Sequence, residues 1–158
     1  MNIVIDIGDM KISENKEDIL VTYALGSCLG LVAYDPVTGT GGIIHCMLPL
    51  STIDPEKSKK NPYMFTDTGV TLFLQELLNK GIKKNNLIIR IAGCSRILDE
   101  KGLFNIGERN YTVARKILWK NDLLITKEDI GGEKTRTVGL EINTGNVFMK
   151  INGETYNL

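Results

Sequence analysis

The chain has 158 residues, of which 42% are hydrophobic and 24% are charged. These proportions are ordinary for a globular protein, and the length predicts a single domain over residues 1–158. Nineteen Lys and Arg residues balance nineteen Asp and Glu residues. Because the chain then has no overall basic field, we expect neither binding to nucleic acid nor attraction to an anionic membrane.

Two features of the sequence indicate the compartment. The N-terminal residues contain no charged leader followed by a long apolar segment, and no apolar run approaches the roughly 20 residues of a membrane span. The three cysteines, Cys28, Cys46 and Cys94, are odd in number and lack CxxC spacing. Such cysteines predict reduced thiols rather than a disulfide framework. We therefore expect a cytoplasmic protein without membrane insertion.

The first half of the chain is rich in strand-like runs. Val, Ile, Leu and Tyr predict strands at Ile3–Ile7, Ile19–Leu25, Leu29–Tyr34 and Gly42–Leu48. The last two are predicted to form a hairpin, because Asp35-Pro36-Val37-Thr38-Gly39 between them is typical of a tight turn. The polar segment from Ser51 to Pro62 has no core pattern and is predicted to be a mobile loop.

The second half adds two helices. The first begins at Asp67 and ends at Gly81, with a buried face of Val70, Phe73, Leu74, Leu77 and Leu78. A strand follows at Leu87–Ala92. Asn105 and Glu108 have the spacing of a capping box and open the second helix, whose buried stripe is Val113, Ala114, Ile117 and Leu118. Strands are again predicted at Leu123–Thr126, Val138–Ile142 and Val147–Ile151.

These elements predict an α+β domain. Two main helices would pack on a largely antiparallel or mixed β-sheet.

One stretch departs from an ordinary core strand, because Cys28 is set between Gly26 and Gly30. Glycine weakens a strand and leaves nothing to pack. His45 is the only histidine, so any Cys–His pair must use it. If the hairpin turn pairs Asp35 with Thr40, His45 lies opposite Gly30.

In that register Cys28 lies opposite Met47, and the cysteine and the histidine become diagonal neighbours on one face. Gly30, which has no side chain, would leave room for the imidazole. A slip of one residue would send Cys28 and His45 to opposite faces.

Such a pair has a chemical use. A free thiol with a pKa near 8.5 is mostly protonated at neutral pH. An adjacent imidazole accepts its proton and stabilises the thiolate, and flexible backbone beside the nucleophile can aim N–H groups at an oxyanion. The alternative is a small buried cysteine and a core histidine without a chemical role. These residues alone leave both interpretations open.

A metal site is not expected. His45 and Cys46 are adjacent, so on a strand their side chains point to opposite faces, and no metal-ligand spacing is present. The Gly-rich segments match neither a phosphate-binding loop nor a dinucleotide fingerprint.

Seven motifs in order along nearly the whole chain resemble the CheD family of chemotaxis proteins. They are Gly8-Asp9-Met10-Lys11, Leu25-Gly26-Ser27-Cys28, Tyr34-Asp35, His45-Cys46-Met47-Leu48-Pro49, Phe104-Asn105-Ile106-Gly107-Glu108-Arg109-Asn110, Asp129-Ile130-Gly131-Gly132 and Thr144-Gly145. The most specific are the second and the fourth, whose cysteine and histidine are seventeen residues apart. Two stretches depart from the family pattern. Ala92-Gly93-Cys94 stands for its Gly-Gly-Ala, and Thr135 for the glycine before Arg136.

The resemblance implies a chemoreceptor glutamine deamidase that needs no cofactor. Members hydrolyse selected receptor glutamines to glutamate, bind the CheC-type phosphatase, and have an α/β layered sandwich fold akin to deamidating toxins. The family's catalytic cysteine, histidine and threonine correspond to Cys28, His45 and Thr22. The implied mechanism is a thioester on Cys28, with oxyanion support from backbone around Ser27 and Leu29 and from Gly26 and Gly30.

Two other functions remain as alternatives. The first is a non-catalytic chemotaxis adaptor that binds receptors and the CheC-type phosphatase. The second is a thiol hydrolase acting on another amide, such as a peptidase.

Overall fold

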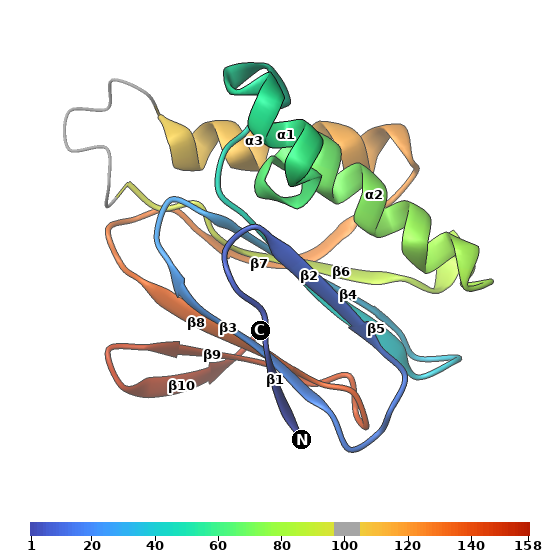
Figure 1. Cartoon of the computed structure of the whole chain (residues 1–158). Helices are drawn as coiled ribbons and strands as arrows, with labels where there is room; N and C mark the ends of the chain where they lie inside the picture. The colour runs from blue at the N-terminus through green and yellow to red at the C-terminus, as the bar shows by residue number, and fades with distance from the viewer. Residues whose placement is uncertain (97–104) are drawn as a thin grey trace.

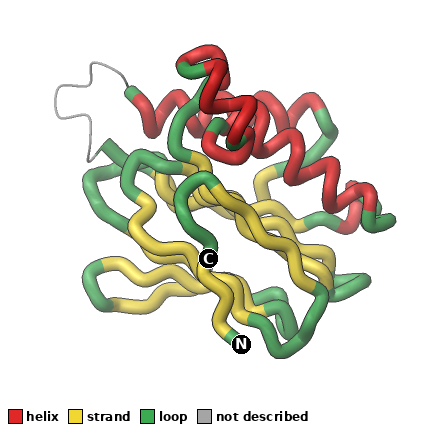
Figure 2. Tube along the Cα trace, viewed as in Figure 1, coloured by secondary structure: helices red, strands yellow, loops and turns green. Residues whose placement is uncertain are grey.

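The structure is a computed structural model that describes residues 1–96 and 105–158. Its described strands form two five-stranded mixed sheets (Figures 1 and 2). The outer sheet has the order β1 (Asn2–Val4), β3 (Ile19–Leu25), β8 (Arg136–Glu141), β9 (Val147–Ile151) and β10 (Glu154–Asn157). The central sheet has the order β2 (Asp9–Ser13), β5 (Thr40–Cys46), β4 (Leu29–Asp35), β6 (Ile88–Gly93) and β7 (Ile125–Ile130).

Three layers are stacked in this fold. The helices α1 (Pro55–Lys60), α2 (Thr66–Asn79) and α3 (Ile106–Lys120) lie on one face of the central sheet, and the outer sheet lies on the other (Figure 1). Pairing is antiparallel except for β1 with β3 and β6 with β7, which are parallel. The predicted α+β sandwich with two main packed helices is therefore confirmed.

The central sheet is buried on both faces, because every residue of β4 and β5 is buried. Successive side chains of a strand point to opposite faces. Leu29, Leu31 and Ala33 accordingly pack in the cluster beneath the helices, whereas Val32 and Tyr34 pack in the cluster shared with the outer sheet. For any residue of these two strands, its position in the alternation therefore determines whether its side chain faces the helices or the outer sheet.

Most predicted elements are present, and β3 and β9 have the predicted bounds. The prediction of a mobile loop from Ser51 to Pro62 is wrong. This segment contains α1 and a 3₁₀ turn at Ser51–Ile53, and a second 3₁₀ turn, Pro62–Met64, begins at its end. Pro55 opens α1, and the Asp54 side chain accepts a hydrogen bond from Lys57 N–H at 3.1 Å. This helix has no buried residue, so no apolar stripe marks it in the sequence.

Other differences concern strand edges and one helix start. The edge strands β2 and β10 were not predicted. Asn105 is the N-cap of α3, as predicted. Its backbone is left-handed (φ 45°), however, and its side chain makes no capping hydrogen bond, so the prediction of a capping box is wrong. Phe104 of the family motif lies outside the described residues. Within the described residues, no helix has both the length and the apolar character needed to cross a bilayer.

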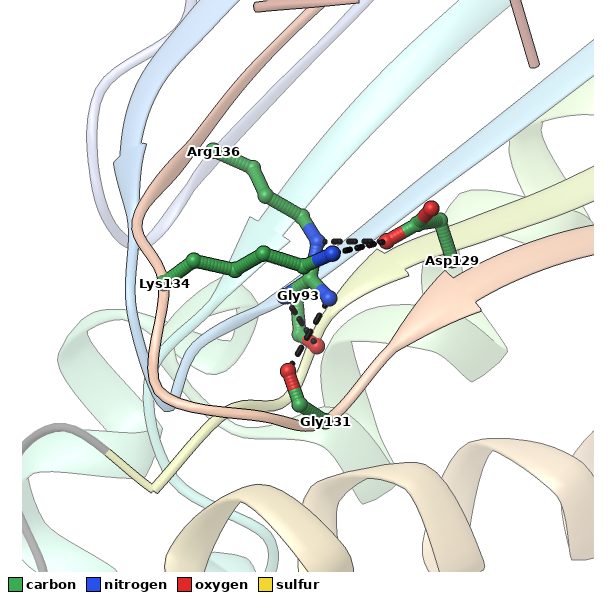
Figure 3. A network of polar contacts seen from close by, with 5 residues as sticks. All are labelled: Gly93, Asp129, Gly131, Lys134 and Arg136. Carbon is green, nitrogen blue, oxygen red and sulfur yellow. Dashed lines mark hydrogen bonds and ion pairs between the residues drawn. The ribbon is translucent and has the colours of Figure 1, made fainter. Parts of the chain in front are cut away.

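A buried arginine joins the two sheets near the end of β6 (Figure 3). Arg136, at the start of β8, is only 1% exposed. Its guanidinium donates to the Gly93 carbonyl at 3.1 Å, to the Gly131 carbonyl at 2.9 Å and to an Asp129 carboxylate oxygen at 2.8 Å. Lys134 also approaches Asp129, at 3.8 Å, but its side chain is 43% exposed.

Replacing these two cations should separate a buried hydrogen-bond network from an exposed ion pair. Arg136→Met removes one donor from each of two carbonyl groups and the buried partner of Asp129, so the free energy of unfolding should fall by about 2 kcal/mol or more. Lys134→Ala should change it by only about 0.5 kcal/mol. Urea denaturation measures both, and equal losses would contradict this account.

Candidate active site

The β4–β5 hairpin has the predicted register. Asp35 pairs with Thr40, and Gly30 pairs with His45. The ladder begins at Leu29 opposite Cys46, so the expected pair of Cys28 and Met47 does not form. Met47 N–H instead donates to the Met64 carbonyl at 2.8 Å, which turns the chain away from β4.

Strand parity places Cys28 and His45 on the same face of the central sheet. Cys28 precedes Gly30 by two residues and packs in the cluster between the sheets. His45 is the cross-strand partner of Gly30 and follows Ile43, which belongs to that same cluster. Both side chains therefore face the outer sheet, as diagonal neighbours across the hairpin.

The outer sheet supplies the partner of the imidazole. Thr22 on β3 is fully buried, and its hydroxyl oxygen lies 2.7 Å from the Ile5 carbonyl oxygen and 2.7 Å from His45 Nδ1. A carbonyl oxygen only accepts, so the single hydroxyl proton is donated to Ile5. Nδ1 of His45 must then carry a proton and donate it to Thr22.

This tautomer leaves a lone pair on Nε2 of His45. The atom is buried and has no hydrogen-bond partner among residues 1–96 and 105–158. An unpaired buried acceptor is uncommon, because buried polar atoms are nearly always bonded. The ring shares a face with Cys28, but no hydrogen bond joins Nε2 to the thiol in the described part of the chain.

Burial keeps both groups neutral in this structure. Desolvation raises the pKa of the Cys28 thiol to about 11, against a smaller lowering by its own backbone N–H. Desolvation lowers the pKa of His45 to about 4, against a smaller opposite effect of Asp6. The thiolate stabilised by imidazolium that the sequence led us to expect is therefore disfavoured, and the resting pair is a thiol and a neutral imidazole.

Cys28 lies at an apolar pocket of about 320 Å³. The lining residues come from β3, from loops next to the strands and from the start of α3: Ile7, Ala24, Gly26, Ser27, Cys28, Met47, Leu48, Ile106 and Thr135. His45 is completely buried and is not among them. A side chain entering this pocket would therefore meet the cysteine first.

The backbone turn beside Cys28 is not made by the glycines that flank it. Ala24 has a left-handed backbone (φ 58°), and β3 carries an irregularity between Thr22 and Leu25. Neither Gly26 nor Gly30 has a positive φ. The space above Gly30 is occupied by Leu25, since a Cβ there would lie 2.7 Å from a terminal methyl group of that side chain.

Gly93 is the glycine on which the position of Cys28 depends, and sequence reasoning missed it. Its φ is +99°, and a Cβ there would lie 2.4 Å from the Cys28 carbonyl oxygen. That same oxygen accepts a hydrogen bond from Cys94 N–H at 2.8 Å. The carbonyl of Gly93 is in turn bonded to Arg136, so the buried arginine supports the strand that holds Cys28.

No group of three or more His, Cys, Asp or Glu side chains suited to a metal ion is found in the described part of the chain. The three cysteines are free thiols.

The lowered pKa of His45 should make stability pH-dependent. Below its usual pKa near 6.5 the unfolded chain binds a proton that the folded protein does not accept until about pH 4. Between pH 7 and 5 this histidine should therefore remove about 2 kcal/mol from the free energy of unfolding. Urea titrations of the wild type and His45→Asn should differ by that amount in their pH dependence. Equal dependence in the two proteins would contradict it.

Comparisons with known proteins agree with this architecture. The model of the CheD family, CheD chemotactic sensory transduction, matches residues 47–151. The "Probable chemoreceptor glutamine deamidase CheD 1" of Syntrophus aciditrophicus is 46% identical over 152 residues, which are 96% of this chain and 95% of that protein. The corresponding protein of Solibacter usitatus is 43% identical over 152 residues, 96% of this chain and 90% of its own length.

The solved structure of the Bacillus licheniformis hypothetical protein YfiH has a similar fold, with a TM-score of 0.50 and 12% identity. It matches 77% of this chain, which spans 49% of the YfiH chain. The family model omits the stretch from Thr22 to His45, but the alignments with the two relatives extend over it. This chain belongs to the CheD family of chemotactic sensory transduction proteins.

Proposed function

We propose that this protein is a chemoreceptor glutamine deamidase, which converts receptor glutamine side chains to glutamate and releases ammonia. The observation that carries the proposal is the imidazole of His45. Its Nδ1 is held by Thr22, and its Nε2, which has no partner among the described residues, lies on the face that it shares with the thiol of Cys28. Relatives over nearly the whole chain are named for this activity.

In the first step, Cys28 Sγ attacks the carboxamide carbon of glutamine while the thiol proton passes to His45 Nε2. Because both groups rest in their neutral forms, proton transfer accompanies the attack rather than preceding it. The imidazolium that forms remains bonded to the Thr22 oxygen through Nδ1. Backbone N–H groups around Ser27–Leu29 stabilise the negative oxygen of the tetrahedral intermediate.

In the second step, His45 returns the proton to the amide nitrogen, and ammonia leaves with the electrons of the C–N bond. The remaining thioester joins Cys28 to the substrate. His45 then takes a proton from water as the oxygen attacks the thioester carbon. The C–S bond breaks, glutamate is released and the thiol recovers its proton, so the reaction uses only thiol, imidazole and water.

The apolar pocket suits a glutamine presented on a helix. Ile7, Met47 and Ile106 surround Cys28, and Ile7 and Met47 are among the exposed large hydrophobic residues. Receptor signalling regions are helical, and helices are recognised through apolar side chains repeated along one face. This rim would bind such a face while the glutamine reaches the thiol.

Family membership also supports a second partner and a location. We propose that the protein binds the CheC-type phosphatase and that it works in the cytoplasm as one domain over residues 1–158. Three free thiols are consistent with a reducing compartment.

A non-catalytic adaptor remains the second candidate. One observation favours it, because the pKa of Cys28 is raised to about 11, as for a structural thiol. Alkylation of Cys28 at pH 9 separates the two candidates. A catalytic thiol should react more slowly when His45 is replaced by Asn, whereas a structural thiol should react at the same rate in both proteins.

Deamidation should depend on Cys28 alone among the three thiols. Mass spectrometry of a receptor cytoplasmic fragment should detect amide-to-acid conversion with the wild type and none with Cys28→Ala. Cys46→Ala is the matched control, because its side chain packs beneath the helices on the opposite face of the sheet. Conversion by a folded Cys28→Ala protein would refute the proposed mechanism.

Thr22 should matter through its hydroxyl. Thr22→Val keeps the shape but leaves Nδ1 of His45 without an acceptor, so kcat should fall by about 10²-fold as the ring loses its orientation. Thr22→Ser retains the hydroxyl and should keep most of the activity. Ammonia release measures both variants, and equal rates for them would show that the hydroxyl plays no part.

A further inference from the structure

Asn110 on α3 is a fully buried polar residue for which the proposed mechanism has no role. Its side-chain nitrogen lies 3.0 Å from the Ser27 carbonyl oxygen and 3.1 Å from the Met47 carbonyl oxygen. Its amide oxygen accepts a hydrogen bond from the Thr66 hydroxyl at 2.9 Å. Two carbonyl groups can be bonded only by an NH₂ group, so these contacts fix the orientation of the amide.

The two carbonyl groups need this donor because both lie where the β4–β5 ladder ends. The ladder starts at Leu29 opposite Cys46, so Met47 lies one residue and Ser27 two residues beyond it. A buried carbonyl without a donor is destabilising. Asn110 therefore bonds both chain segments where they separate: the one that leads from Cys28 into β4 and the one that leaves β5 after His45.

Fixing the Ser27 carbonyl also fixes the N–H of Cys28. The two groups belong to one planar trans peptide unit, in which the C=O and the N–H point in opposite directions. With its carbonyl bonded to the helix layer, this peptide must direct the Cys28 N–H away from that layer. The opposite side is the face between the sheets, on which the Cys28 side chain packs.

The Cys28 N–H is available there as a donor. It lies outside the β4 ladder, which begins at the next residue, and no backbone acceptor for it is found in the described part of the chain. Burial raises the pKa of the Cys28 thiol, and this backbone N–H lowers it by a smaller amount. When the sulfur attacks an amide, the carbonyl oxygen gains negative charge close to the sulfur. A backbone N–H beside the sulfur can therefore donate to that oxygen.

We propose that Asn110 is a positioning residue for deamidation, which holds the Ser27–Cys28 peptide so that the Cys28 N–H donates to the oxyanion. The inference rests on the proposed function and names one donor for it. Asn110 does not touch the substrate. It acts through the peptide that it bonds, and Thr66 fixes its amide from the other side.

The test compares two changes in the same buried network. Asn110→Asp keeps the size of the side chain but removes both donors, and Asn110→Ala is the second variant should the first fail to fold. Thr66→Val is the matched control, because it removes one hydrogen bond of the network while leaving both bonds from the amide nitrogen to the carbonyl groups. Thermal melts identify the folded proteins.

Two rates are measured on each variant: deamidation of a receptor fragment, and alkylation of Cys28 by iodoacetamide at pH 9. Alkylation displaces iodide and forms no oxyanion, so it reports the thiol and its access alone. We expect kcat for deamidation to fall by about 10²-fold in the Asn110 variants, with KM and the alkylation rate within about twofold of the wild type. Thr66→Val should keep most of its kcat.

Unchanged kcat in a folded Asn110 variant would overturn the inference. A fall in alkylation proportional to the fall in kcat would also overturn it, because Asn110 would then hold the thiol rather than the oxyanion donor. If the wild type does not deamidate the fragment at all, the proposed function itself fails, so the two failures are distinguishable.

Discussion

The orientation of the His45 imidazole depends on the hydroxyl of Thr22. It has one proton, which the Ile5 carbonyl takes, and therefore it must accept from His45. Thr22 belongs to the outer sheet, whereas His45 belongs to the central sheet. The tautomer and the orientation of the imidazole are thus set by how the two sheets stack. A site of this kind exists only when the sandwich is fully assembled.

Much of this arrangement could be predicted from local sequence. The strands β3 and β9 and the β4–β5 register follow from apolar runs and from one turn, and a two-residue period then determines which face Cys28 and His45 share. Elements without a buried face were missed, because α1 and the exposed strand β10 leave no apolar pattern.

The contacts that complete the site could not be predicted in this way. Asn110 is 83 residues from Ser27 along the chain, and no spacing rule connects two such positions. The left-handed backbone occurs at Ala24, where a side chain makes it rare, rather than at the flanking glycines. Gly93 is conspicuous only once the Cys28 carbonyl is known to lie against it. Each of these is a product of tertiary packing.

The neutral state of the resting pair has a consequence for selectivity. A thiol whose pKa is raised to about 11 is almost entirely protonated at neutral pH. The thiolate is the form of cysteine that reacts with oxidants and with other electrophiles. In the proposed reaction the proton moves to His45 only as a carboxamide occupies the apolar pocket. Filling that pocket excludes water, which strengthens each hydrogen bond to the developing oxyanion. Burial therefore lowers the intrinsic reactivity of the Cys28 thiol. It also strengthens the hydrogen bonds to the oxyanion, which form only when an amide is correctly placed in the pocket.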